Sequence, residues 1–207
     1  MNRNVLYHGD CLEIMKSFPD NSIDMIITDP PYSKNYNWVW EFLSIEGYRV
    51  LKDNAHLISL LGHNQLPIAI EFLSKTLRYW WICGLENNRS NKLFGKNVII
   101  KFKPAIWFIK GKRLRENDGY FPFDFIKVEK DEFKESKKKH RWGQPVTFFE
   151  NFIKHCTTSE SLILDMFAGS GTTGVACRNF NRDFILIEKE EKYCQIISDR
   201  LGIEING

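Results

Sequence analysis

The chain has 207 residues, of which 43% are hydrophobic and 14% aromatic, and its formal net charge is +3. A chain of this size buries one good core, so we expect a single domain over residues 1–207, with one insertion. No stretch approaches the roughly 20 apolar residues of a membrane span, and the N-terminus lacks the apolar core of a signal peptide. These observations exclude a membrane protein and predict a soluble, cytoplasmic one.

The cysteines and histidines do not form metal-binding or disulfide patterns. Five cysteines, at positions 11, 83, 156, 177 and 194, show no C-x-x-C spacing, and five histidines show no H-x₃-H spacing. An odd number of cysteines with this spacing indicates buried thiols instead of a disulfide framework. We expect no bound metal.

The first part of the chain alternates between strand-like and helix-like segments. The apolar periodicity predicts strands at residues 5–7, 23–28, 55–61 and 78–83, and helices at residues 11–18, 39–51 and 66–74. The segment 23–28 is short, apolar and bounded by a turn, which is typical of a strand buried on both faces. The rhythm indicates an α/β fold.

The tetrapeptide Asp29-Pro30-Pro31-Tyr32 follows the apolar segment 23–28. It places a carboxylate, two rigid residues and an aromatic ring at one strand terminus. A planar amino group on a nucleobase fits such a site, with the tyrosine ring stacked on the base and the carboxylate accepting an N–H bond. This motif indicates chemistry on nucleic acid bases.

Positive charge is concentrated in residues 84–141, which contain 16 Lys and Arg against 8 Asp and Glu, whereas the rest of the chain has 13 against 18. Short strands are expected at residues 98–100 and 105–109, near a sheet edge. The basic residues alternate with aromatic ones, which suits a surface that follows phosphates and stacks on bases. For the run 137–139 alone, a solvated lysine-rich loop is the other interpretation.

The second part of the chain predicts a helix at residues 145–156, a strand at 161–167, a glycine loop at 168–174, a helix at 175–180 and a strand at 184–188. The glycines at 169, 171 and 174, followed by Glu188, match the dinucleotide fingerprint, which alone is a weak signal. An acid at this position binds the ribose of any adenosine cofactor.

Asp165, directly before the glycine loop, separates the cofactor classes. Its negative charge would repel the two phosphates of a dinucleotide. It favours a ligand with an ammonium and a sulfonium, because unlike charges at about 4 Å gain several kcal/mol at intermediate dielectric. S-adenosylmethionine has both groups. The alternative is that Asp165 only caps the loop.

Together the two motifs resemble the circularly permuted, or β-group, DNA amino-methyltransferases, in which D-P-P-Y precedes F-x-G-x-G. The opening block from Gly9 to Tyr32 and the cofactor block from Asp165 to Thr173 carry the resemblance. It implies a Rossmann-like methyltransferase fold: a seven-stranded, mostly parallel sheet with one antiparallel strand, and helices on both faces. It also implies a target-recognition insertion at about 84–141 and a bacterial or phage-encoded protein.

The resemblance also assigns the site residues. The catalytic residues would be Asp29, Pro30, Pro31 and Tyr32. Within the cofactor site, the loop and Asp165 would line the methionine part, Glu188 the ribose, and Asp10 the adenine. The full set expected to bind S-adenosyl-L-methionine is Asp10, Cys11, Asp29, Gln144, Pro145, Asp165, Phe167, Ala168, Gly169, Ser170, Gly171, Thr172, Thr173, Glu188 and Lys189. The chain departs from the family at Gln144, where many members carry lysine, and its recognition region is short.

By this resemblance the protein flips a base out of double-stranded DNA and methylates its exocyclic amine, with adenine N6 favoured over cytosine N4. The absence of a Pro-Cys nucleophile near the pocket argues against cytosine C5 methylation. Two other hypotheses stay open: a catalytically idle protein that binds cofactor and DNA, and a nicotinamide-dependent oxidoreductase. The sequence leaves open whether the protein is a monomer or a homodimer, and whether a cognate restriction endonuclease accompanies it.

Overall fold

The computed structural model describes residues 2–31, 34–93, 96–112, 121–129, 132 and 143–207. Within these residues, nine strands form one sheet in the order β6-β4-β5-β3-β2-β7-β8-β1-β9. The strands are β1 (Val5–His8), β2 (Ile23–Thr28), β3 (Leu51–Leu60), β4 (Arg78–Leu93), β5 (Val98–Ile109), β6 (Phe125–Ile126), β7 (Leu162–Asp165), β8 (Asp183–Glu188) and β9 (Ile205–Asn206). Only β5 runs antiparallel to its neighbours, β3 and β4; the other pairs in this part of the chain are parallel.

The predicted count of seven strands was wrong for this sheet. The two-residue strands β6 and β9 pair with β4 and β1 at the two outer edges. Two residues are too few to give a periodic sequence signal, so neither strand was expected. The expectation of one reversed strand in a mostly parallel sheet is confirmed.

A second correction concerns β5, which is one continuous strand of 12 residues instead of two short ones. Residues 105–109 pair with both β3 and β4, whereas the segment before them pairs with β4. Pro104 and the polar residues before it interrupted the apolar pattern. Because Pro104 lies just beyond the β3 pairing, its missing N–H removes no bond to β3.

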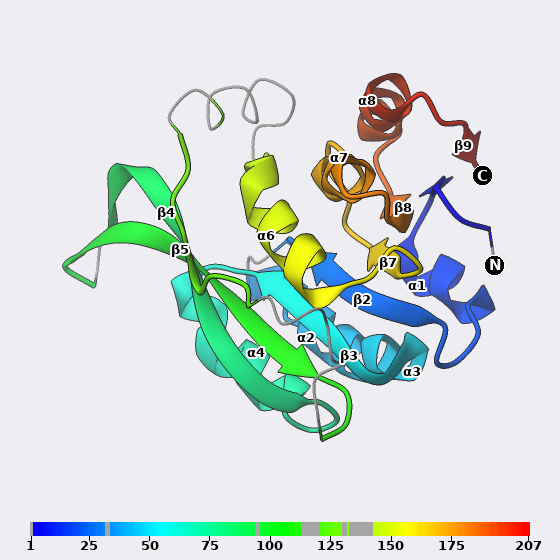
Figure 1. The fold of residues 1–207 in the computed structure, drawn as a ribbon. Coiled ribbons are helices and arrows are strands. Elements are labelled where there is room, and N and C mark those ends of the chain that lie inside the picture. The colour runs from blue at the N-terminus through cyan, green and yellow to red at the C-terminus, as the bar shows by residue number, and fades with distance from the viewer. Residues whose placement is uncertain (1, 32–33, 94–95, 113–120, 130–131, 133–142) are drawn as a thin grey trace.

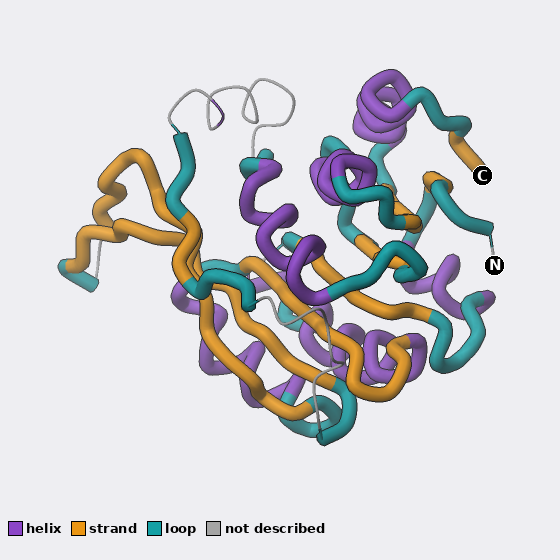
Figure 2. Tube along the Cα trace, in the orientation of Figure 1, coloured by secondary structure: helices purple, strands orange, loops and turns teal. Residues whose placement is uncertain are grey.

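Helices cover both faces of the sheet (Figure 1). They are α1 (Cys11–Ile14), α2 (Trp38–Phe42), α3 (Tyr48–Val50), α4 (Leu66–Leu73), α6 (Val146–Cys156), α7 (Thr172–Asn179) and α8 (Glu191–Leu201), and a π-helical turn, Leu43–Gly47, joins α2 to α3. Figure 2 shows the same two helical layers on either side of the strands. None of the helices in the described ranges is long and apolar enough to cross a membrane.

The two layers bury separate hydrophobic clusters. One cluster joins α6, α7 and α8 to the sheet, and the other joins α1 to α4 to the opposite face. In α6, Phe148 and Phe152 lie one turn apart and their ring centroids are 5.1 Å apart. The strand β2 is buried along its whole length because helices cover both of its faces. β7 is also buried at all four of its residues, so the ends of both strands are packed within the core.

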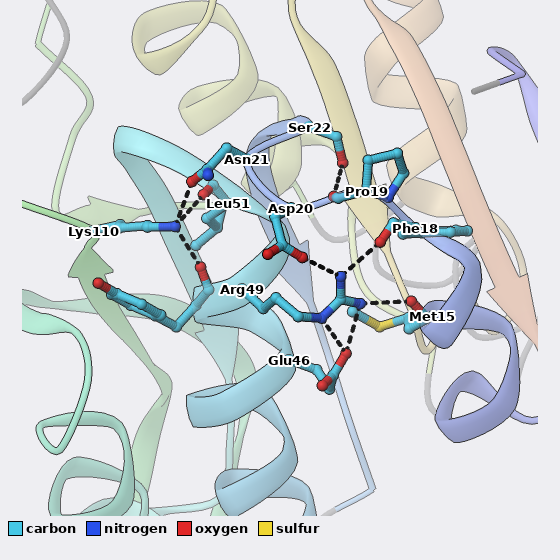
Figure 3. Close-up of polar contacts among 11 residues, drawn as sticks. Met15, Phe18, Pro19, Asp20, Asn21, Ser22, Glu46, Arg49, Leu51 and Lys110 are labelled. Atoms are coloured by element: carbon cyan, nitrogen blue, oxygen red, sulfur yellow. Dashed lines mark hydrogen bonds and ion pairs between the residues drawn. The ribbon is translucent and has the colours of Figure 1, made fainter.

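Arg49, at the end of α3, ties the segment before β2 to the helical layer (Figure 3). Its guanidinium donates to the main-chain oxygens of Met15 (2.7 Å) and Phe18 (2.6 Å), and to the carboxylates of Asp20 and Glu46. These carboxylates raise the pKa of Arg49 further above its usual value. The contacts fix the turn through which the chain enters β2.

Lys110, directly after β5, reinforces the same turn from the other side (Figure 3). Its buried ammonium donates to Asn21 Oδ1 and to the main-chain oxygens of Tyr48 and Leu51, at 2.7 to 2.8 Å. Burial lowers the pKa of this lysine. The start of β2 is thus held by two cations from separate elements.

Replacing Arg49 tests how much this network contributes. Arg49→Met removes the donor that two main-chain oxygens and two carboxylates share, so we expect a loss of about 2–4 kcal/mol in the free energy of unfolding by urea. The matched control is Arg3→Met, which breaks the more exposed pair with Asp183 and should cost below about 1 kcal/mol. Equal losses of stability in the two variants would show that the Arg49 contacts stabilise the fold no more than an exposed ion pair does.

Candidate active site

The predicted site residues meet at the carboxyl ends of the neighbouring parallel strands β2, β7, β8 and β1. A cavity of about 910 Å³ opens there. In open α/β sheets ligands bind in such crevices outside the carboxyl ends of the strands. The volume lies within the usual range for small-molecule pockets, about 300–1,000 Å³.

Asp165 is the last residue of β7 and its side chain lies at the base of the cavity, 3% exposed. Thr28, at the end of β2, donates to Asp165 Oδ1 at 2.7 Å, Thr173 donates to Oδ2, and the Phe167 N–H donates to Oδ1 at 3.1 Å. Burial raises the pKa of Asp165 to about 6, although these three donors oppose the shift. The carboxylate joins the end of β2 to the loop after β7.

The glycine loop after β7 turns directly into α7. Gly171 has φ of 75°, a left-handed conformation that side chains disfavour, and a Cβ there would lie 3.0 Å from the Ile197 side chain. A Cβ on Gly174 would lie 2.6 Å from Leu201. The loop thus needs Gly171 for its turn and Gly174 for the close packing of α7 against α8.

Glu188 ends β8 and anchors the glycine loop from its other side. Its Oε2 accepts from the Gly169 N–H at 2.7 Å, and its Oε1 accepts from the Glu190 N–H at 2.9 Å. Burial raises the pKa of this carboxyl group, with the two N–H donors opposing the shift. Glu188 and Asp165 therefore hold the loop between two carboxylates.

Asp10 lies at the opposite end of the cavity, after β1. It caps α1 by accepting from the Leu12 N–H at 3.0 Å and forms an ion pair with Lys189 at 2.9 Å. Both contacts lower the pKa of Asp10. The neighbouring Cys11 is buried, and burial raises the pKa of its thiol to about 12, which makes it a poor nucleophile.

Asp29 follows β2 and lies beside the base of the glycine loop. Lys103 Nζ lies 2.7 Å from both Asp29 carboxylate oxygens, and Gln144 Nε2 donates to Oδ2 at 2.8 Å. Pro30 and Pro31 continue along the cavity wall. Tyr32 lies outside the described residues.

Most of the predicted site residues line this cavity. They are Asp10, Cys11, Asp29, Pro30, Pro31, Gln144, Asp165, Phe167, Ala168, Gly169, Ser170, Thr172, Thr173, Glu188 and Lys189. Two predicted residues are not on its wall: Pro145 is buried at the start of α6, and Gly171 lies against Ile197.

Sequence reasoning missed several aromatic residues of the cavity wall. These are Tyr36 and Trp38 near the start of α2, Phe149 on α6 and Tyr193 on α8. The pair Tyr36 and Trp38 had a usable signal, because it follows the D-P-P-Y motif within a few residues. Phe149 and Tyr193 had none, since aromatic residues on amphipathic helices usually pack in the core.

The glycine loop and the Asp-Pro-Pro segment thus share one cavity at adjacent strand ends of an α/β sheet, which is the usual place for a ligand in this fold class. The N6/N4 methyltransferase family model, described as DNA methylase, matches residues 23–199. The chain therefore belongs to this family.

Individual relatives agree with the family. Type II methyltransferase M2.MboI of Moraxella bovis is 28% identical over 94% of this chain and 86% of its own length. M.HinfI of Haemophilus influenzae is 24% identical over 96% of this chain and 68% of its own length.

Two of the similar solved structures cover nearly the whole chain. The M1.HpyAVI–SAM complex has a TM-score of 0.80 and 26% identity, covering 96% of this chain and 99% of that one. The PvuII DNA methyltransferase (cytosine-N4-specific) has a TM-score of 0.75, covering 97% and 93%, and its 18% identity supports the fold alone.

The raised pKa of Asp165 generates a test by pH. Its folded-state pKa of about 6 exceeds the ordinary 3.8, so the folded protein takes up a proton that the unfolded chain does not take up until lower pH. Stability from this residue should rise by about 1 kcal/mol between pH 7 and pH 5. Asp165→Asn cannot titrate at this position. The free energy of unfolding by urea, measured for both proteins, should therefore increase by about 1 kcal/mol more in the wild type than in Asp165→Asn when the pH falls from 7 to 5. A pH-independent difference contradicts this assignment.

Proposed function

We propose that this protein is a site-specific DNA-methyltransferase that methylates the N6 amine of adenine in double-stranded DNA. One observation carries the proposal: the Asp29 carboxylate and the glycine loop open into the same cavity. The D-P-P-Y motif favours adenine N6. Cytosine N4 is the second candidate, because both bases present an amine that the same acceptors can bind.

S-adenosyl-L-methionine is the cofactor. The DNA methylase family uses this cofactor, and the solved structure with a TM-score of 0.80 is the M1.HpyAVI–SAM complex. The cavity fits this ligand chemically, since it combines the acidic side chains Asp165 and Glu188 with the Phe167 ring and the glycine loop. This combination favours methyl transfer over the nicotinamide oxidoreductase hypothesis, because a dinucleotide would bring two phosphates toward Asp165.

Within this cavity we assign the cofactor contacts as follows. Asp165, Phe167 and Gly169 hold the methionine part, Glu188 holds the ribose, and Asp10 lies at the adenine, while Gly171 supports the turn of the loop from outside the cavity wall. The bound cofactor supplies an electrophilic methyl group on a sulfonium. Because the partners of Asp165 among the described residues are neutral donors, its negative charge is balanced by the cation of the ligand.

The remaining steps are performed by residues of the D-P-P-Y motif. A base flipped out of the duplex loses a few kcal/mol of stacking and pairing, part of which the Tyr32 ring recovers by stacking. Asp29 and the Pro30 carbonyl accept hydrogen bonds from the exocyclic amine and aim its lone pair at the methyl group. The N–C bond forms as the S–C bond breaks, and the cationic nitrogen then releases its proton to solvent.

The target-recognition region is proposed at about residues 84–141. In its described part, the β5 residues that precede Ala105, the first residue to pair with β3, pair with β4 and form a two-stranded extension (Figure 1). Its exposed residues include Lys96, Val98, Ile99 and Lys101. Exposed lysines beside apolar side chains suit a surface that contacts DNA phosphates.

The relatives are named Type II methyltransferases. We propose that this protein likewise acts in restriction-modification, with a cognate endonuclease of the same recognition site. We further propose a circularly permuted arrangement, in which the catalytic block precedes the cofactor block along the chain.

The test is transfer of labelled methyl from S-adenosyl-L-methionine to unmethylated duplex DNA, with mass identification of the nucleoside product. The wild type should yield N6-methyladenine. Asp29→Ala should lower transfer at least about 100-fold while the cofactor Kd stays within about twofold, because the change removes an acceptor of the reacting amine. Gly171→Asp should weaken cofactor binding first, since its side chain collides with Ile197.

The alternative outcomes are distinct. N4-methylcytosine would keep the mechanism and change the base. Cofactor binding and salt-sensitive DNA binding without any product would favour the catalytically idle protein. In that case Asp29 would serve only as the acceptor for Lys103 and Gln144. An equal loss of cofactor affinity in both variants contradicts the residue assignments.

A further inference from the structure

Among the described residues, the pair between Lys103 and Asp29 is the more enclosed of the two ion pairs compared at the cavity. Lys103 Nζ lies 2.7 Å from both carboxylate oxygens, and the two side chains are only 11% and 16% exposed. By contrast, the pair between Lys189 and Asp10 at the far end has exposures of 70% and 34%. Little water competes for the Asp29 pair, so its geometry is well defined.

The reversed strand β5 brings Lys103 to this place. Ala105 of β5 pairs with Leu60 at the end of β3, and the Leu61 N–H bonds to the Pro104 oxygen at 3.1 Å. Lys103 is the next residue, so it lies just beyond the carboxyl end of β3, beside β2. Because β5 is antiparallel to β2 and β3, the residues at its N-terminal side lie at the edge of the sheet where β2 and β3 end.

Lys103 and Gln144 together fix the Asp29 carboxylate. The ammonium bridges both oxygens, and the Gln144 amide adds a second donor on Oδ2 at 2.8 Å. The donors come from β5 and from the segment before α6, so they approach from separate elements. A carboxylate held on both oxygens cannot rotate, and its remaining lone pairs point in set directions.

The two carboxylates of the cavity also differ in their charge partners. Asp29 receives a cation from the protein, whereas Asp165 accepts hydrogen bonds from Thr28, Thr173 and the Phe167 N–H. A cationic ligand is therefore attracted to Asp165 more than to Asp29. This difference keeps Asp29 available for a neutral amine.

We propose that Lys103 is a positioning residue for Asp29, which fixes the carboxylate toward the target amine. The inference rests on the proposed function of the site. Lys103 acts through Asp29 and need not touch the base. It places part of the catalytic machinery on β5, outside both sequence motifs.

The first experiment compares Lys103→Met with the wild type in the methyl-transfer assay. We expect kcat to fall about 10- to 100-fold, because orientation of the reacting groups is lost, while the cofactor Kd stays within about twofold. Lys103→Arg should retain more activity than Lys103→Met. The matched control is Lys16→Met, which breaks an exposed pair with Glu13 and should leave kcat unchanged.

Two further variants separate positioning from simple stability. In an Asp29→Asn background, the fold-decrease in kcat caused by Lys103→Met should be at most about a fifth of the decrease in the wild type. The reason is that Asp29→Asn has already removed the ion pair with Lys103. In a Lys103→Met background, Gln144→Lys should restore at least about fivefold, since position 144 already reaches Asp29 Oδ2. Circular dichroism should show the wild-type fold in each variant.

The outcomes distinguish this inference from the proposed function. A wild type that methylates no DNA overturns the proposed function itself. An active wild type with unchanged kcat in Lys103→Met overturns the positioning role. Equal effects of Lys103→Met in both backgrounds, or no recovery with Gln144→Lys, show that Lys103 does not act through its charge on Asp29.

Discussion

The parallel pairing of β2 with β7 is the constraint on which the site depends. Met25 and Ile26 lie beside Ile163 and Leu164, so Thr28 and Asp165 reach the same edge of the sheet. Their hydrogen bond of 2.7 Å, buried beneath the cavity, joins the strand that carries the Asp-Pro-Pro segment to the strand that carries the glycine loop. Two segments more than 130 residues apart in sequence thus act as one site.

The four carboxylates around the ends of these strands differ in whether a cation of the protein neutralises them. Asp29 has its cation from β5, Asp10 has one from Lys189, and Asp165 and Glu188 are satisfied by hydroxyl and main-chain donors. Burial raises the pKa of both Asp165 and Glu188. Of these four carboxylates, the two beside the glycine loop have no ion-pair partner among the described residues, whereas Asp29 and Asp10 are paired with lysines. In the proposed function, this difference suits a cationic cofactor at the loop and a neutral amine at Asp29.

Local sequence patterns predicted much of this structure. The apolar run at 23–28 is β2 with the same bounds, because six buried residues between a turn and a proline pair define a short interior strand. The glycine turn after β7 was also predicted, but its end was placed too late: α7 begins at Thr172, so the predicted loop residues 172–174 are helical. Gly174 is needed there because a side chain would meet Leu201 of α8.

Features set by long-range pairing were not predicted. The extent of β5 depends on its pairing with β4 across polar residues, and no local pattern shows this. Lys103 was counted only as one basic residue of the region 84–141, because a lysine's ion pair depends on which strand ends lie together. The aromatic residues Phe149 and Tyr193 reached the cavity wall for the same reason: helix packing, and not periodicity, decides which part of the apolar face borders an opening.

The most direct measurement is a crystal structure of the protein with S-adenosyl-L-homocysteine. If the joint of β2 and β7 creates the active site, the amino-acid part of the ligand should lie against Asp165 and the glycine loop, with its sulfur facing Asp29 and Pro30. A ligand bound outside this cavity, or one whose sulfur points away from Asp29, would contradict the central claim that the two strand ends form a single methyl-transfer site.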